Sequence, residues 1–288
     1  MSCPILLLEG DQGSGKTSTA NALGRLIDPS ASQSRAAPRN QKDLLVGCAG
    51  SRMIGFDNQS EISPSLSDDL CKVVSGVAFI TRKLYTNAEI SSLIVKRAIT
   101  MTAITLPAIA GDLGDRLIRI PLDRIPAERR TDEGLLHWEW RRDHPVILAG
   151  LLDLAVKVQA ILPKIRHTDL PRMADYGRML LAVDQILDTK GYRRYETMTQ
   201  SVTQRVIADD LVAAAIVATV TEPVTMSAGD LLECLRSDTA EWNQITPRAM
   251  SSRLQRATAS LRAVGWTVTK IQPTGHPYVT RWLLSPPR

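Results

Sequence analysis

The residues best suited to chemistry lie near the start of the chain, in the run Gly10-Asp11-Gln12-Gly13-Ser14-Gly15-Lys16-Thr17-Ser18. An apolar run, Ile5 to Glu9, precedes it and predicts a strand, and a helical pattern, Lys16 to Ile27, follows it. In such a unit the N–H groups of the loop and of the first helical turn point toward the phosphates of a nucleotide. Lys16 would bring a cation to the terminal phosphates, and Thr17 would bring a hydroxyl to Mg²⁺. The run therefore predicts a phosphate-binding loop (P-loop) for ATP.

Asp57 is the residue that could complete such a site. It ends the apolar run Met53 to Asp57, and a carboxylate at the end of a strand can hold Mg²⁺ and its water shell. We predict that Asp57 is the acidic Walker B residue, with a strand-end turn former as the alternative. Asn58 follows where many ATPases have glutamate, and its amide can position a water but cannot act as a base. Glu61 is either the missing carboxylate or a surface side chain.

Thr102 is a candidate for contact with the γ-phosphate. It lies inside the β-branched run Ala98 to Ile104, which predicts a strand. If that strand lies between the strand before the P-loop and the strand of Asp57, the hydroxyl of Thr102 comes close to the phosphate. We interpret Thr102 as a sensor, with a strand residue whose hydroxyl is satisfied inside the sheet as the alternative.

Arg116 precedes another expected strand, Leu117 to Leu122. An arginine at such a position could serve as a finger that stabilises the charge on the transferred phosphoryl group. It could equally form a surface ion pair with Asp112 or Asp115. The residues themselves leave both interpretations open.

Three regions of the chain must position these residues. Residues 1–125 alternate β-branched runs with helical segments, which predicts an α/β core with a parallel sheet. Residues 126–199 carry apolar side chains at helical spacing, most clearly between Ile147 and Val158, and predict a helical lid. Residues 200–288 give three helices followed by a β-hairpin, and this order predicts a winged-helix domain.

The third helix of the last region has two different faces. Thr246-Pro247 predicts its start, and an apolar stripe runs along it from Met250 to Val264. Its other side is small and basic, which suits the groove of DNA, although docking to a protein is the alternative. That side carries Arg248, Ser252, Gln255, Arg256, Ala259 and Arg262, and the expected wing strands add Lys270 and Arg281.

Composition limits the class of protein. Hydrophobic residues make up 44% of the 288 residues, as in a folded globular protein, and the net charge of +5 favours an acidic partner such as nucleic acid. The four cysteines are far apart, which argues against a zinc site or a disulfide framework. No export signal or membrane span is evident, so we expect a cytoplasmic protein. The expected first strand begins almost at Met1, which suggests a fragment or a truncated member of its family.

Six segments carry a resemblance when they are taken together. These are Glu9 to Thr17, Phe56 to Ser60, Asp68 to Cys71, Thr81 to Thr86, Asp112 to Arg116 and Leu170 to Tyr176. Only the P-loop is specific by itself, and the resemblance depends on the order and spacing of all the segments. In this order they resemble the AAA+ helicase-like ATPases of phages and mobile elements, which are related to superfamily III viral helicases and to the minichromosome maintenance motor.

The resemblance implies further roles. It places Arg116 as a finger that reaches a neighbouring subunit, makes Thr102 sensor 1, and makes Arg172, at the start of a lid helix, sensor 2. A solvent-exposed arginine is the alternative for Arg172. Arg82 and Lys83 would lie on a hairpin that projects into the pore of a ring and grips DNA phosphates, with an exposed charge pair as the alternative.

The fold expected on these grounds is a P-loop AAA+ core with a helical lid and a C-terminal winged helix. The expected function is a DNA translocase or replicative helicase that forms a ring, expected to be a hexamer, and hydrolyses ATP with Mg²⁺. An ATP-switched DNA-binding regulator that does not unwind DNA is the main rival, and Asn58 favours it. A small-molecule phosphotransferase is a second rival, which the winged helix disfavours.

Overall fold

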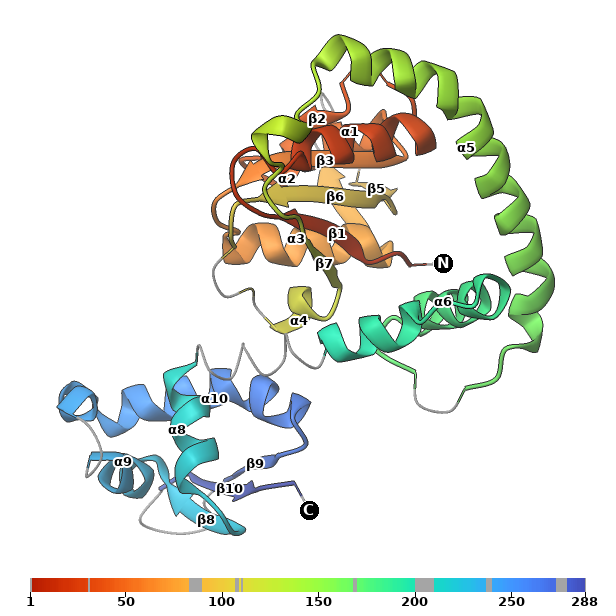
Figure 1. Cartoon of the computed structure of the whole chain (residues 1–288). Helices are drawn as coiled ribbons and strands as arrows, with labels where there is room; N and C mark the ends of the chain where they lie inside the picture. The colour runs from red at the N-terminus through yellow and green to blue at the C-terminus, as the bar shows by residue number, and fades with distance from the viewer. Residues whose placement is uncertain are drawn as a thin grey trace. The chain divides into compact units, whose positions relative to one another are not determined.

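The computed structural model describes residues 2–30, 32–82, 90–106, 109, 111–167, 170–199, 210–236, 240–272 and 279–287. The chain divides into two compact units, Met1–Thr199 and Gln200–Arg288, and Figure 1 shows the elements of each. Lys83 lies outside the described residues, and of Arg82 only the backbone is described.

A five-stranded sheet forms the centre of the first unit. Its strands are β1 (Ile5–Glu9), β2 (Ser34–Arg35), β3 (Met53–Gln59), β6 (Ala98–Ala103) and β7 (Leu117–Pro121). They lie in the order β2-β3-β6-β1-β7, and every pairing is parallel. The predicted α/β core with a parallel sheet is therefore confirmed. Because β1, β6 and β3 are parallel and β6 lies between the other two, the carboxyl ends of these three strands lie side by side.

Helices flank this sheet, and two of them begin at a side-chain cap. They are α1 (Lys16–Ile27), α2 (Gln41–Ala49), α3 (Pro64–Ser75) and the short α4 (Gly111–Gly114). The side chain of Asn40 accepts a hydrogen bond from Asp43 N at the start of α2, and Ser63 accepts one from Leu66 N before α3. Gly76 then ends α3 with a φ of 77°, in the left-handed region that glycine adopts readily.

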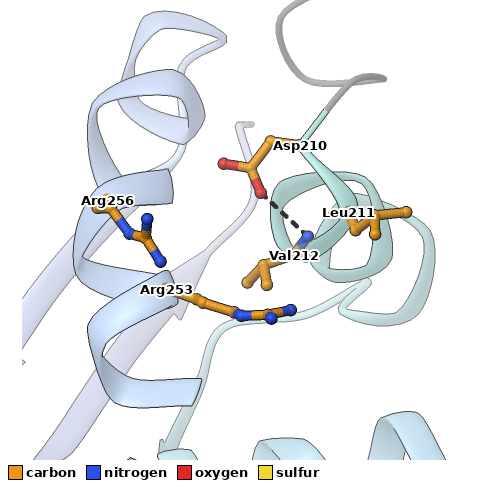
Figure 2. A pocket seen from close by; sticks show the side chains of 5 residues that line it. All are labelled: Asp210, Leu211, Val212, Arg253 and Arg256. Carbon is orange, nitrogen blue, oxygen red and sulfur yellow. Dashed lines mark hydrogen bonds between the residues drawn. The ribbon is translucent and has the colours of Figure 1, made fainter. Parts of the chain in front are cut away.

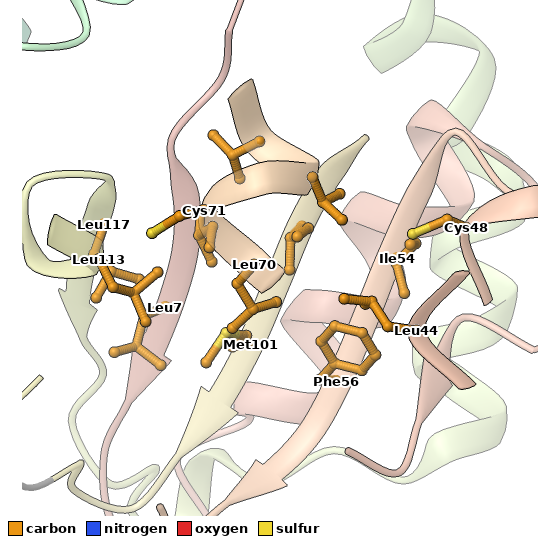
Figure 3. Packing of buried hydrophobic residues seen from close by; sticks show 14 of the residues in the cluster. Leu7, Leu44, Cys48, Ile54, Phe56, Leu70, Cys71, Met101, Leu113 and Leu117 are labelled. Carbon is orange, nitrogen blue, oxygen red and sulfur yellow. The ribbon is translucent and has the colours of Figure 1, made fainter. Parts of the chain in front are cut away.

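The core of this unit is mainly aliphatic and includes two buried thiols. Figure 3 shows side chains from β1, β3 and β6 packed against those of α2, α3 and α4. Burial raises the pKa of Cys48 to about 11 and that of Cys71 to about 12, so both remain protonated and pack as small apolar groups. The largest fully buried side chains of the unit are Ile5, Leu7, Leu8, Leu44, Ile54, Leu70, Ile99, Met101, Leu113 and Leu117.

A separate antiparallel pair lies between α3 and β6 along the chain. Strand β4 (Ala78–Arg82) pairs with β5 (Ile90–Ile94), and Arg82 lies opposite Ile90 in the register. This is the position in the sequence at which the resemblance implies a β-hairpin. Arg82 ends the first strand of the pair.

The region after β7 is helical, but its longest helix is not buried. It comprises η1 (Ala127–Arg129), α5 (Glu133–Ile161), η2 (Leu162–Lys164) and α6 (Ala174–Leu187), and residues 191–199 are also helical. Arg172 precedes α6 by two residues rather than opening it. α5 contains no buried residue, and Figure 1 shows it as a long curved helix at the outside of its unit.

The apolar stripe that predicts α5 thus does not pack into a core. Val146 and Val156 keep 75% and 67% of their surface exposed. By length and composition alone, Glu133–Lys164 could cross a membrane, with a mean hydropathy of 1.8 in its most apolar window, none of which is buried. It is the one such helix among the described residues. The periodicity predicted the helix correctly but not its exposure.

In its described residues, the second unit combines three α-helices and a short 3₁₀ helix with a small antiparallel sheet. Its elements are α8 (Leu211–Thr219), β8 (Val224–Ser227), α9 (Ala228–Arg236), η3 (Ala240–Gln244), α10 (Pro247–Ala263), β9 (Thr267–Ile271) and β10 (Arg281–Ser285). The sheet order is β8-β10-β9. Ser227 and Asp230 exchange two hydrogen bonds between side chain and backbone N–H, which form a capping box at the start of α9. The predicted Thr246 cap and Pro247 start of α10 are also confirmed, whereas β8 was not predicted.

Candidate functional site

The loop between β1 and α1 can form only because glycines occupy three of its positions. Gly13 and Gly15 have φ values of 80° and 77°, in the left-handed region that other residues rarely adopt. A Cβ atom on Gly10 would lie 2.2 Å from the carbonyl oxygen of Leu122. Gly15 is also the N-cap of α1, so the helix starts directly from the loop and presents its first N–H groups there.

Lys16 is held inside the loop by the loop itself. Its Nζ donates to the carbonyl oxygens of Gly10 and Asp11 at 2.6 and 2.8 Å, and to Ser14 Oγ at 3.4 Å. The ammonium group thus lies among the backbone atoms that would surround a bound phosphate. An anionic ligand would offer it stronger acceptors than these neutral carbonyls.

Three elements converge on a single carboxylate oxygen, Oδ1 of Asp57. Thr17 Oγ1, at the start of α1, donates to it at 3.0 Å, and Thr102 Oγ1, on β6, donates to it at 2.5 Å. Thr102 is buried, and its Oγ1 also accepts a hydrogen bond of 2.8 Å from Asn58 N. Residues from α1, β3 and β6 are thereby brought together, as the strand order requires.

These oxygens fit a magnesium ion. Mg²⁺ is bound octahedrally by oxygen ligands at about 2.1 Å, so adjacent ligands are separated by about 3 Å. Thr17 Oγ1 and Asp57 Oδ1 are 3.0 Å apart and belong to groups that Mg²⁺ prefers. Across the described residues no group of three or more His, Cys, Asp or Glu side chains could hold a metal ion. Because Mg²⁺ takes six ligands, Thr17 and Asp57 would leave positions for water and phosphate oxygens.

The position after Asp57 has an unusual backbone. Asn58 has a φ of 54°, and the register between β3 and β6 shifts between Phe56 and Gln59. The side chain of Asn58 is exposed, as is that of Glu61. The geometry brings neither side chain into a described hydrogen bond with Asp57, so both remain candidates for positioning a water.

Arg116 lies at the end of the sheet where the strands begin, opposite the P-loop. It directly precedes β7, whose first residue, Leu117, pairs with Ile5 at the start of β1, and its carbonyl oxygen accepts a hydrogen bond of 2.7 Å from Ile5 N. The P-loop follows the opposite end of β1. Within one chain Arg116 is therefore remote from the P-loop, and its Nη1 pairs with Asp112 Oδ1 at 2.8 Å.

Arg172 joins Arg116 rather than the P-loop. Its guanidinium contacts Asp112 Oδ1 and lies 3.2 Å from Asp115 Oδ2. Burial alone would raise the pKa of Asp112, but hydrogen bonds from Arg116 and Cys71 and the charges of both arginines hold that pKa below its usual value. The structure brings the two arginines together at a shared carboxylate and does not bring Arg172 to the loop of its own chain.

The basic residues predicted on α10, together with Lys270 of β9, divide into three groups. Arg248 is exposed on the side opposite the buried stripe. Arg256 lines a hollow beside the start of α8 together with Arg253, Asp210, Leu211 and Val212, as Figure 2 shows. The Nε of Arg262 donates to Val268 O at 3.1 Å, and Lys270 Nζ donates to Gln255 Oε1 at 3.3 Å and lies over the ring of Trp282. Arg262 and Lys270 thus tie α10 to the small sheet.

Two family models match the chain. The model of the actinomycete integrative conjugative element replication protein matches residues 1–210, and that of the AICE RepA C-terminal domain matches residues 212–285. The chain belongs to this replication-protein family. It is thus a replication protein of a mobile element, and no curated protein matches it significantly in sequence.

Two solved structures are distantly similar to this family member. A crystal structure of JCV helicase aligns at 19% identity and a TM-score of 0.32, over 70% of this chain and 56% of that chain. The C-terminal region of NrS-1, in an apo form, aligns at 13% identity and a TM-score of 0.40, over 98% of this chain and 67% of that chain. The chain therefore spans little more than half of the helicase chain.

One set of residues beside the loop of this replication protein was not predicted from the sequence. A hollow next to Gly13 and Gly15 is also lined by Arg124, Arg129 and Arg130, from the segment that follows β7. Closely spaced arginines directly after the last core strand were the available signal. Their relation to the loop depends on how that segment folds back, which no local pattern encodes.

Proposed function

We propose that this replication protein is an ATP-dependent DNA motor whose subunits form a ring and hydrolyse ATP at their junctions. The proposed fold is a P-loop AAA+ core with a helical lid and a C-terminal winged helix. The observation that carries the proposal is the convergence of Thr17, Asp57 and Thr102 beside Lys16, with Arg116 and Arg172 at the opposite edge of the sheet.

In this mechanism the protein positions and neutralises charge. The loop N–H groups and Lys16 hold the β- and γ-phosphates, while Thr17 and Asp57 would hold Mg²⁺, which neutralises charge on the phosphates when bound. The buried hydroxyl of Thr102 fixes the carboxylate of Asp57, and Asn58 or Glu61 positions the attacking water. Arg116 and Arg172 lie beside the start of β7, at the opposite end of β1 from the P-loop of their own subunit. This position supports a role at the nucleotide site of a neighbouring subunit.

DNA contact is proposed for two parts of the chain. Arg82 and Lys83 belong to the segment of the β4–β5 pair, where a hairpin could grip a strand in the pore of the ring. The described part of the second unit has three α-helices, with β8 between α8 and α9, followed by the antiparallel pair β9–β10, which supports a winged helix, and Arg248 and Arg256 are exposed on α10. A net charge of +5 is consistent with this partner.

Mixing two inactive variants tests whether the site lies between subunits. Lys16→Ala subunits keep Arg116, and Arg116→Ala subunits keep the P-loop, so mixed rings contain junctions with both groups intact. We expect each variant alone to lose ATPase activity by about 10³-fold and the mixture to recover part of it. Failure to recover activity in rings shown to be mixed would contradict catalysis between subunits.

A second candidate function is an ATP-switched DNA-binding regulator. It is favoured by Asn58, because an amide cannot accept the proton of the attacking water. Strand separation on a forked DNA distinguishes the two functions. A motor unwinds the fork only with hydrolysable ATP, whereas a regulator changes its affinity for duplex DNA with ATP or a non-hydrolysable analogue and leaves the fork intact.

A further inference from the structure

The segment after β7 is hydrogen-bonded to the P-loop and to the last residue of β1 before it. Leu122 N donates to Glu9 O at 2.7 Å, and Ile125 N donates to Gly13 O at 3.0 Å. Any Cβ on the loop glycines would meet this segment, at Leu122 O for Gly10, at Arg130 Nη2 for Gly13 and at Ile125 Cδ1 for Gly15. Residues 122–130 therefore cover one side of the loop.

A hollow separates residues 122–130 from the first turn of α1. Gln12, Gly13, Gly15 and Ser18 line it from the loop side, and the segment after β7 lines it with the apolar side chain of Ile125 and three arginines, Arg124, Arg129 and Arg130. Leu136, in the first turn of α5, adds a second apolar side chain. The hollow thus offers apolar surface for a flat ring and several cations for an anion.

The three arginines have no ion-pair partner within the part of the chain that the structure describes. Arg130 has the most defined position. Its Nε donates to Ile125 O at 3.3 Å, and its Nη2 lies 3.4 Å from the place of a Cβ on Gly13. The backbone contact through Nε holds the guanidinium against the loop and leaves its other nitrogen atoms available for an anion.

The strand order fixes the direction of a bound triphosphate. Thr17 contacts Asp57 near the carboxyl end of β3, which lies on one side of β1, whereas the segment carrying Arg130 follows β7 on the other side. If the metal and the terminal phosphates lie by Thr17 and Asp57, the nucleoside end of the molecule points toward the hollow. The α-phosphate then passes between Gly13 and Ser18, next to Arg130.

We propose that Arg130 binds the α-phosphate of the nucleotide within its own subunit, while Ile125 and Leu136 contact the base. This role for Arg130 rests on the proposed nucleotide site. It differs from the role proposed for Arg116, since Arg130 contacts a phosphate that ATP and ADP share and needs no neighbouring chain. Loss of the Arg130 side chain therefore weakens the binding of ATP and of ADP by the same factor.

Calorimetric titration of the full chain with ADP and with a non-hydrolysable ATP analogue tests this. A charge-assisted hydrogen bond to phosphate contributes enough that Arg130→Ala should weaken both ligands by about 10- to 100-fold. Arg130→Lys should recover part of the affinity, because it keeps the charge but loses the planar fork. Arg141→Ala, which removes an exposed arginine of α5, is the matched control and should bind like the parent.

The outcomes separate this inference from the proposed function. If Arg130→Ala and Arg130→Lys bind both nucleotides like the parent while Lys16→Ala does not, the role of Arg130 is wrong and the P-loop assignment stands. A loss confined to the ATP analogue would also overturn it, because the contact would then lie at the γ-phosphate. If the parent itself binds neither nucleotide, the proposed function fails and the role of Arg130 with it. Thermal unfolding of each variant shows whether it remains folded.

Discussion

Arg116 and Arg172 both contact the same oxygen atom, Oδ1 of Asp112, although 55 residues of chain lie between them. One belongs to the turn before β7 and the other to the segment before α6. Two like charges remain close here because a single carboxylate lies between them. Asp112 thereby decides where both guanidinium groups lie in a single chain.

Asp112→Asn should lower stability at neutral pH but not in acid. Contact with the arginines lowers the pKa of Asp112 in the folded state, so the stabilisation is complete above the unfolded pKa and is lost as pH falls through the folded pKa. The side chain is 53% exposed, and we expect a cost below about 1 kcal/mol at pH 7. Thermal unfolding at pH 7 and pH 3 measures it. Asp153→Asn, on exposed α5, is the control, and an equal effect at both pH values would contradict the prediction.

Thr102→Val should cost both stability and ATPase activity. The substitution removes the hydroxyl that donates to Asp57 Oδ1 and accepts from Asn58 N, which leaves a backbone N–H without its partner. Such a loss costs about 1 to 3 kcal/mol. Because the carboxylate of Asp57 is then less well oriented, we expect turnover to fall by at least about tenfold. Denaturant unfolding and steady-state ATPase assays measure the two effects.

Thr100→Val is the matched comparison for that experiment. Thr100 is buried on the same strand, but its Oγ1 reaches only Ile54 O, at 3.5 Å. Its replacement should change stability by less than about 1 kcal/mol and leave turnover intact. If the two variants behave alike, the hydroxyl of Thr102 has no special relation to Asp57.

Replacements of Asn58 should separate backbone strain from chemistry. Because the backbone of Asn58 has a φ of 54°, alanine at this position should lower the free energy of unfolding by about 1 kcal/mol or more relative to glycine. Asn58→Gly should therefore be more stable than Asn58→Ala, while both lack the amide that could hold a water. Equal loss of ATPase in both variants, with unequal unfolding midpoints, is the expected result. Normal activity in Asn58→Gly would assign the water to another group.

Two arginines of α10 should differ in what they contribute. Arg248 is exposed, so Arg248→Ala should leave unfolding unchanged and reduce the salt dependence of DNA binding by about one unit. Arg262 donates to Val268 O, so Arg262→Ala should lower the unfolding temperature and affect DNA binding less. DNA affinity across a salt series, together with calorimetry, measures both. The reverse pattern would place the DNA contact on the β9 side of the helix.

The sequence was informative wherever a residue type and its neighbours determine structure locally. The glycines of the loop, the Ser227 and Asp230 cap and the start of α10 at Pro247 follow from φ preferences and short-range hydrogen bonds. The strand of Thr102 was also predictable, because a buried parallel strand gives a nearly continuous apolar run, here with three β-branched residues. Its position between β1 and β3 makes the contact with Asp57 possible.

Other features depend on long-range packing that no local pattern carries. The pairing of Arg116 with Arg172 through Asp112 depends on where the segment before α6 returns to the sheet. The apolar spacing of α5 predicts a helix, but spacing cannot tell whether its apolar face meets a core. Strand β8 has only four residues, too few for an alternating pattern to be distinguished from a loop.

Lys16 has a consequence for the kinetics of the nucleotide. Its ammonium group already lies among the carbonyl oxygens of Gly10 and Asp11. The cation that would neutralise a bound phosphate is therefore already in the loop. Arrival of a triphosphate then exchanges the acceptors of this lysine and does not require the side chain to move in from solvent. Such a preorganised cation has little reorganisation to complete, so we expect nucleotide association to be limited by diffusion into the loop.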